Sequence, residues 1–178
     1  RNKLKQQFLQ TAPNLVWVSD VTYVRVAKDF YAICVVIDLF SRKVIAHKIS
    51  KENNTELVLE TFKLAYERRG NPQGLLFHSD QDTQYSAYKF RKHLRDSGVR
   101  QSFSNPGTPY DNAVVESFFR MMKQKELSHN YCHSEDELNA TVADYVNLFN
   151  TMRPHRKLGG QSPDDFEKRF YAGQQSAV

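Results

Sequence analysis

The chain has 178 residues, enough for one domain with a sizeable hydrophobic core and one active site. Hydrophobic residues make up 40% of the sequence and charged residues 25%, which excludes a wholly disordered chain. No apolar run reaches the roughly 18 residues that a membrane span needs, so we expect no membrane association. The formal net charge of +5 and the isoelectric point near 9.2 agree with a polyanionic partner without identifying one.

The cysteines and the first residues indicate a cellular compartment. Cys34 lies in an apolar run and Cys132 in a polar stretch, and the two do not resemble a disulfide framework. The first ten residues are too polar for a signal peptide. We therefore expect a cytoplasmic protein. Because the chain begins with Arg1 rather than Met, we also expect it to be part of a longer protein.

The first third of the chain predicts a meander followed by a helix. Runs rich in Val, Ile, Tyr and Phe predict strands over residues 15–26, 30–39 and 43–50. The breaks between them are short, so neighbouring strands are expected to be antiparallel. From Asn54, apolar residues recur at helical spacing until Gly70, Asn71 and Pro72 end the pattern.

The rest of the chain alternates strands and helices before two final helices. We expect a strand over 74–79, a helix over 85–97, a strand over 99–103 and a Pro- and Gly-rich loop over 104–109. Helices follow over 111–127 and 134–151, the second opening with the capping-box pair Ser134 and Glu137. This βββαβαβαα order predicts an α/β fold with a mixed five-stranded sheet flanked by helices. We divide the chain into an N-terminal extension (1–14), a core (15–151) and a basic C-terminal tail (152–178) broken by prolines and glycines.

Three carboxylates stand where this fold can bring them together. Asp20 lies in the first strand, Asp80 ends the fourth, and Glu116 lies one turn into a helix, with 35 residues between Asp80 and Glu116. At about 100° per residue, Glu116, Arg120 and Lys123 share one helix face. The opposite, apolar face is expected to carry Val114, Phe118, Met121 and Met122. Clustered carboxylates suit two divalent ions that act on a phosphodiester, while the cations suit phosphate.

These residues stand in five ordered blocks that carry a family resemblance. The blocks are Trp17 to Tyr23, Ile37 to Arg42, His78 to Gln81, Tyr110 to Phe118, and Asn150 with Arg153-Pro154-His155 and Leu158-Gly159. Over nearly its whole length the chain resembles the catalytic core of DDE transposases of bacterial insertion sequences, a group similar to retroviral integrases. The spacing of 35 residues is typical of that group.

The resemblance implies a fold, a reaction and its requirements. It implies an RNase H-like fold and metal-dependent cleavage and strand transfer of DNA during transposition. It implies two Mg²⁺ or Mn²⁺ ions, one held by Asp20 and Asp80 and the other by Asp20 and Glu116. Partners would be DNA, both element ends and target, with association with the nucleoid when DNA is bound. Joining two ends also implies a homo-oligomer, and a region before Arg1 is expected to recognise the ends.

Two positions depart from the family pattern. Asp82 stands where glycine is common, two residues after the second aspartate. We interpret it as a bystander in the turn, with an extra charge near the metals as the alternative. Phe149 stands where tyrosine commonly precedes the asparagine of the tail motif. Neither departure touches the three acids.

Several residues also have simpler interpretations. Taken singly, Asp20 could be a solvated acid at a strand end, Asp80 a helix cap, and Glu116 an ordinary first-turn residue. We interpret Asp38 as structural, bonding the turn at Ser41 and Arg42.

The histidines and aromatic residues have packing interpretations. His78 is expected to pack, with orientation of a carboxylate as the alternative. Trp17 and the pair Phe118 and Phe119 are expected in the core. His129, Cys132 and His133 form a compact group without an apparent fourth zinc ligand, so we do not expect a zinc site.

The predicted DNA contacts are Arg120, Lys123, Asn112 and Arg153. Asp111 and Asn112 have a second interpretation as caps of the helix that carries Glu116. The basic tail, with Arg153 and His155, could bind phosphate or pack on a neighbouring subunit. At the level of function, the alternatives are a catalytically inactive nucleic-acid-binding or assembly module of the same fold, and an RNase H-like nuclease.

Overall fold

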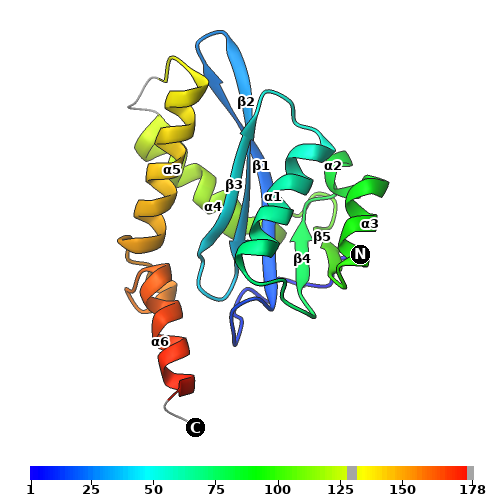
Figure 1. The fold of residues 1–178 in the computed structure, drawn as a ribbon, viewed down its shortest axis with the longest axis vertical. Coiled ribbons are helices and arrows are strands. Elements are labelled where there is room, and N and C mark those ends of the chain that lie inside the picture. The colour runs from blue at the N-terminus through cyan, green and yellow to red at the C-terminus, as the bar shows by residue number, and fades with distance from the viewer. Residues whose placement is uncertain (128–131, 176–178) are drawn as a thin grey trace.

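The structure, a computed structural model, describes residues 1–127 and 132–175 and is built on one mixed sheet (Figure 1). Its strand order is β3-β2-β1-β4-β5. β1 (Val16–Val26), β2 (Asp29–Asp38) and β3 (Val44–Ser50) form the predicted antiparallel meander. β4 (Leu76–Ser79) pairs parallel with β1, and β5 (Arg100–Phe103) pairs parallel with β4. The prediction of a mixed five-stranded sheet is confirmed.

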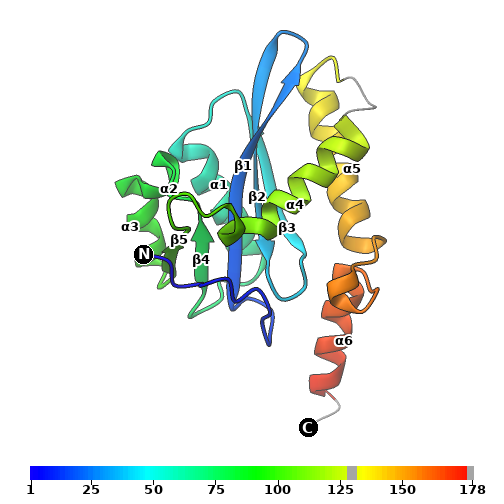
Figure 2. The same cartoon turned by 180° about the vertical axis from the view of Figure 1, so that it is seen from behind.

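Helices cover both faces of this sheet (Figures 1 and 2). α1 (Thr55–Arg68), α2 (Thr83–Ser86) and α3 (Tyr88–Asp96) lie on one face. α4 (Ala113–Met122) and α5 (Glu135–Thr151) lie on the other. The 3₁₀ turn η1 (Pro109–Asn112) precedes α4, and the π-helical turn η2 (Lys123–Leu127) continues it. The turn η3 (Arg156–Leu158) leads to a last helix, α6 (Pro163–Gln175).

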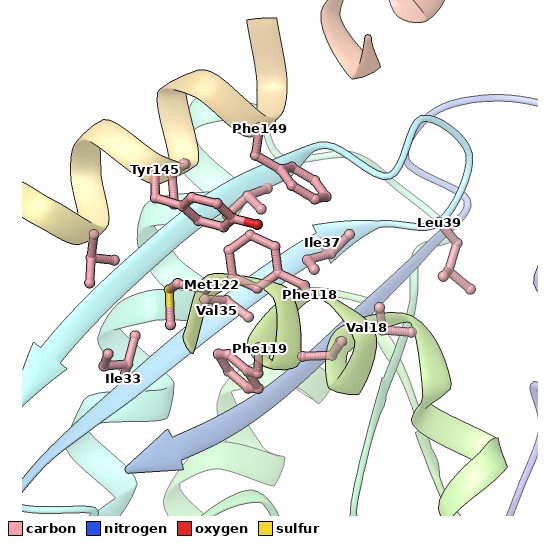
Figure 3. Packing of buried hydrophobic residues seen from close by; sticks show 14 of the residues in the cluster. Val18, Ile33, Val35, Ile37, Leu39, Phe118, Phe119, Met122, Tyr145 and Phe149 are labelled. Carbon is pink, nitrogen blue, oxygen red and sulfur yellow. The ribbon is translucent and has the colours of Figure 1, made fainter. Parts of the chain in front are cut away.

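The alternation of side chains along β2 builds two cores. Val35 and Ile37 pack against α4 and α5, whereas Cys34 and Val36 face α1 and α3. Because both faces are covered, the strand reads as a continuous apolar run. On the α4 side, Phe118 lies against Phe149 with ring centroids 4.9 Å apart (Figure 3). Trp17 is fully buried on the other side, and the predicted core positions of Trp17, Phe118 and Phe119 are confirmed.

The predicted helix ends agree with the observed caps. The Asn54 side chain accepts a hydrogen bond from the N–H of Leu57 at 3.0 Å and starts α1. The Ser134 hydroxyl likewise accepts from the N–H of Glu137 at 3.2 Å. The Glu137 carboxylate reaches back to the N–H of His133, at 2.7 Å, so this variant of a capping box satisfies two orphan donors.

The prediction of one helix over 85–97 was wrong. The segment breaks at Ala87, whose backbone is extended (ψ 140°), into α2 and α3. Tyr85 and Phe90 are both fully buried against the same sheet face. On one straight helix these two side chains would point about 140° apart, so the break lets both of them enter the core.

The helix that carries Glu116 also differs from its prediction. Residues 109–112 form a 3₁₀ turn and the α-helix begins at Ala113. Its buried residues are Val115, Phe118, Phe119 and Met122, so the predicted apolar face is rotated: Val114 and Met121 are half-buried. This rotation places Val114 and Met121 beside an apolar groove on the outer side of the helix.

The N-terminal extension packs onto the core. Leu4 is 2% exposed, and the backbone N–H groups of Lys3 and Leu4 donate to the Ser102 hydroxyl at 2.8 and 3.2 Å. The three sequence boundaries stay a prediction. None of the helices in the described part of the chain is long and apolar enough to cross a membrane.

The tail contains a helix that the sequence did not predict. Pro154, Gly159 and Gly160 precede this helix, α6, which begins at Pro163 and includes Gly173. Glu167, 6% exposed, accepts two hydrogen bonds from the Arg69 guanidinium at 2.6 and 3.0 Å and one from the Ser41 hydroxyl at 2.6 Å. A buried, fully bonded carboxylate therefore joins α6 to the end of α1 and to the β2–β3 turn.

We expect Glu167→Ala to lower the free energy of unfolding by about 3–5 kcal/mol, because it removes both short hydrogen bonds of the Arg69 guanidinium and leaves only the 3.9 Å ion pair with Asp38. Urea denaturation followed by circular dichroism measures the change. Lys168→Ala is the matched control, since its ammonium lies 4.0 Å from Asp165 on the exposed side of the same helix, and should cost within about 0.5 kcal/mol. Equal losses in the two variants would contradict this role for Glu167.

Candidate active site

Asp20 and Asp80 are brought together by the parallel pairing of β1 with β4. Ser19 and Ser79 are register partners, so the residue that follows each stands at the same level of the sheet. Asp80 directly follows β4, and Asp20 lies within β1. The structure therefore places the first two predicted acids side by side at one edge.

Glu116 reaches the same edge from the first turn of α4, which packs on β1. The Asn112 amide donates to the Ser19 carbonyl at 3.1 Å and ties the start of α4 to the residue before Asp20. Asn112 is 1% exposed and its side chain does not cap the helix. Its predicted role as a cap was wrong, since its amide instead holds the start of α4 against β1, and its contact with DNA stays a prediction.

The loop before α4 is organised by Asp111, which is also not a cap. Its carboxylate, 2% exposed, accepts hydrogen bonds from the Asn105 N–H at 2.9 Å and the Thr108 hydroxyl at 2.7 Å. It also accepts from the amides of Asn2 and Gln6, at 2.8 and 2.9 Å. Burial raises the pKa of Asp111, but these hydrogen bonds outweigh it and the net shift is downward. A charged carboxylate thus joins this loop to the N-terminal extension.

The catalytic-acid candidates repel one another. Burial raises the pKa of Asp20 from 3.8 to about 7, a hydrogen bond from the Val21 N–H opposes the rise, and the charges of Asp80, Asp82 and Glu116 add to it. The pKa of Glu116 is raised by burial and by Asp80, with Arg120 opposing. Perturbed carboxylates that share one cleft are typical of functional sites.

Asp82 belongs to this group, so its interpretation as a bystander was wrong. The residue is exposed, makes no cap hydrogen bond to α2, and its charge helps to raise the pKa of Asp20. With Asp80 and Glu116 it lines a cleft of about 390 Å³ whose other wall is the loop from Ser104 to Thr108. Asp82, at the position where glycine is common, thus adds a negative charge to those of Asp20, Asp80 and Glu116.

The predicted cations fall into two groups. Arg120 is exposed and acts on Glu116, while Lys123 is half-buried, and its pKa is lowered by burial and raised by Asp20. Both lie beside the acids. Arg153 lies elsewhere: its guanidinium contacts the Met121 sulfur at 2.9 Å, and its charge acts on the Tyr145 hydroxyl. Arg153 therefore contacts both α4 and α5, and its contact with DNA stays a prediction.

His78 and Asp38 have the structural surroundings that the sequence predicted. His78 is fully buried between the hydroxyls of Ser102, at 2.9 Å, and Ser104, at 3.2 Å. Asp38, also fully buried, accepts from the N–H groups of Asn14 and Phe40 at 2.8 and 2.9 Å. Its backbone carbonyl accepts from the N–H of Arg42 at 2.8 Å and closes the turn.

A buried polar cluster behind Asp20 was missed by the sequence analysis. The hydroxyls of Ser19 and Tyr85 lie 2.7 Å apart, and the Cys34 sulfur is 3.7 Å from each. These residues come from β1, α2 and β2, and no local pattern connects them.

The acids are not already closed around a metal position. Within residues 1–127 and 132–175, no three His, Cys, Asp or Glu side chains stand as a ready set of metal ligands. His129, part of the His129, Cys132 and His133 group, lies outside the described residues.

The chain is similar in fold to retroviral integrases. It superposes on the HTLV-2 integrase catalytic core domain in complex with magnesium with a TM-score of 0.72 at 18% identity, over 88% of this chain and 97% of that one. A chain of the simian T-cell lymphotropic virus intasome gives a TM-score of 0.77 at 17% identity, over 89% of this chain and 56% of that one. The predicted RNase H-like fold is confirmed.

Sequence comparisons name the family. Two models described as integrase core domain match residues 10–109 and 97–163. The transposase for insertion sequence element IS904 of Lactococcus lactis is 35% identical over 94% of the chain and 66% of its own length. The transposase InsF for insertion sequence IS3A of Escherichia coli is 35% identical over 96% of the chain and 60% of its own length. The chain belongs to the integrase core family of insertion-sequence transposases, and it spans less than two thirds of the length of these relatives.

We expect Asp20→Asn to stabilise the metal-free protein at pH 8 by about 2–4 kcal/mol. The folded-state pKa of Asp20 lies above its unfolded value, so its contribution to stability is present below about pH 4 and is lost as the pH rises toward about 7. The advantage of the variant should therefore grow over that window and stay constant above it. Denaturation curves from pH 4 to 9 in the presence of a chelator measure it.

Asp96→Asn is the control for this titration. Asp96 is exposed, and its hydrogen bond with Lys92 lowers its pKa, so this variant should lose a little stability. An Asp20→Asn advantage that did not vary with pH would show that Asp20 ionisation is not what destabilises the site.

Proposed function

We propose that this chain is the catalytic core of a transposase that cuts and joins DNA phosphodiester bonds, with two Mg²⁺ or Mn²⁺ ions held by Asp20, Asp80 and Glu116. The observation that carries the proposal is the convergence of these three acids, from β1, the end of β4 and α4, on one edge, where the pKa values of Asp20 and Glu116 are raised. The reaction is that of a polynucleotidyl transferase with endonuclease activity.

The donor set suits hard divalent cations. Carboxylate oxygens are the ligands such ions prefer. Burial, with the charges of Asp80, Asp82 and Glu116 added to it, raises the pKa of Asp20, and a bound cation would offset both effects. Asp20 and Asp80 would hold one ion, and Asp20 and Glu116 the other. When bound, two ions supply Lewis-acid activation of the attacking hydroxyl and neutralise charge at the leaving oxygen. Because the acids are not yet arranged as ligands, we expect metal binding to draw their side chains together.

The protein's own groups bind and orient the DNA. Arg120 and Lys123, beside Glu116 and Asp20, would neutralise the phosphates that flank the scissile bond. Asn112 fixes the start of α4 relative to Asp20 through its bond to Ser19. Joining two element ends requires two ends held together, so we propose that the protein acts as a homo-oligomer.

The first test is Mg²⁺- or Mn²⁺-dependent nicking and joining of labelled oligonucleotides with precut ends. We expect metal-dependent products from the chain and a loss of at least about 100-fold in Glu116→Gln, which keeps the size of the side chain but removes a metal ligand. Glu126→Gln, on the turn after α4, is the matched control and should keep full activity.

A thermal shift with Mn²⁺ gives a readout that does not depend on turnover. The metal should raise the melting temperature of the chain and of Glu126→Gln, but not of Glu116→Gln. Absence of both products and metal-linked stabilisation would favour the catalytically inactive nucleic-acid-binding module. Cleavage without joining would favour an RNase H-like nuclease.

DNA contact by the cations predicts a salt dependence. Arg120→Gln and Lys123→Gln should each weaken binding of duplex DNA uniformly across sequences and reduce the slope of log K against log[salt] by about 1. Fluorescence anisotropy over a salt series measures it. Lys28→Gln, exposed in the β1–β2 turn, is the control, and a slope unchanged in the first two variants would remove them from the DNA interface.

A further inference from the structure

A second groove lies on the other side of α4 from Arg120 and Lys123. It has a volume of about 420 Å³, within the roughly 300–1,000 Å³ that small ligands or inserted side chains occupy. Its floor and walls are largely apolar, formed by Phe8, Ile37, Val114, Met121 and Phe149.

The groove follows from the rotation of α4. At about 100° per residue, α4 has three stripes. Val115, Phe118 and Met122 face the sheet, and Glu116 and Arg120 face the acidic edge. The third stripe, with Val114, Ser117 and Met121, lines the groove. An occupant of the groove would therefore touch the helix that carries Glu116 without entering the catalytic cleft.

The formally charged side chains that line the groove are positive. Arg42, Arg156 and Lys157 line it, and no Asp or Glu lines it among the described residues. Arg156 and Lys157 are exposed on the turn η3. The Asp38 carboxylate, whose charge acts on Arg42, already accepts hydrogen bonds from two backbone N–H groups. The groove thus favours an anionic occupant.

Two buried nitrogen atoms at the groove are unpaired. Nη1 of Arg42 and Nε2 of His155 are buried and have no hydrogen-bond partner in the described part of the chain. Both side chains are held in place: Nη2 of Arg42 donates to the Phe8 carbonyl at 3.0 Å, and the His155 ring packs edge-on against Phe149 at 4.6 Å. Burying a polar group without a partner is costly, so an acceptor that reached Nη1 of Arg42 would be bound strongly, and Nε2 of His155 adds a second donor when that atom carries a proton.

We propose that this groove binds an acidic segment of a partner protein, which inserts a large apolar side chain between Phe8 and Met121 and offers a flanking carboxylate to Arg42 and His155. Apolar walls with a cationic rim match such a segment, whereas a DNA backbone has no apolar group to fill the walls. Leu9, 81% exposed at the rim, adds apolar surface that the segment would cover.

The probe is a fluorescein-labelled peptide with Phe-Leu flanked on both sides by Asp and Glu, with its ends blocked. Anisotropy should show saturable binding to the 178-residue chain. A peptide with Asn and Gln in place of the acids should bind at least about tenfold more weakly. Amide shifts in NMR spectra should map to residues 113–121 and 153–158.

Two variants separate recognition from folding. Arg156→Glu with Lys157→Glu reverses two exposed charges, and Val114→Glu places an acid in the wall; each should weaken the peptide at least about tenfold. Lys28→Glu with Arg91→Glu reverses two exposed charges away from the groove and should bind as the unmodified chain does. Circular dichroism confirms that each variant is folded.

Three outcomes would overturn the proposal. Equal binding of the acidic and amide peptides would exclude recognition of the carboxylates. Displacement of the peptide by a short random-sequence duplex, with the same amide shifts, would make the groove part of the DNA interface. Shifts at these amides that grow with protein concentration in the absence of peptide would make a second copy of the chain the occupant. None of these results bears on the metal-dependent activity, which is tested separately.

Discussion

The parallel pairing of β1 with β4 is the constraint on which the site depends. Because Ser19 and Ser79 are register partners, Asp20 and Asp80 stand together whatever their own side chains prefer. A shift of one residue in this register would turn Asp20 toward the other face. The buried alternation of β1 and β2 against two helical layers makes such a shift costly. The packed core thus holds the carboxylates of Asp20 and Asp80 close together in spite of their electrostatic repulsion.

Negative charge is concentrated at this edge of the sheet. Asp80, Asp82 and Glu116 line the cleft, and burial, with the charges of these three acids added to it, raises the pKa of Asp20 and so destabilises the metal-free fold. The surroundings are arranged to bear this cost: Asp111 is held by four hydrogen-bond donors, and Asn112 anchors the helix start. Functional sites commonly hold such destabilised groups.

Local patterns predicted the strands, the starts of α1 and α5, and the three acids as candidates, because residue period, caps and block spacing depend on neighbouring residues. They failed where partners lie far apart in sequence. The break at Ala87 exists so that Tyr85 and Phe90 can both enter the core, and α6 depends on Glu167 meeting Arg69. Asn112 looked like a cap because its type favours one, but its amide bonds to Ser19, 93 positions away. Residue type alone does not distinguish these partners.

The three stripes of α4 explain why these features depend on one another. One stripe packs on the sheet, one carries Glu116, and one lines the apolar groove, so a small rotation of this helix would alter all three together. The Phe118 ring packs against the rings of Tyr145 and Phe149 from α5, and these contacts oppose such a rotation. Arg153 adds a contact to Met121 from the far end of α5. The tail motif thus stabilises, through packing on α4, the helix that holds the third acid. This gives the motif a physical role although none of its residues reaches the catalytic edge.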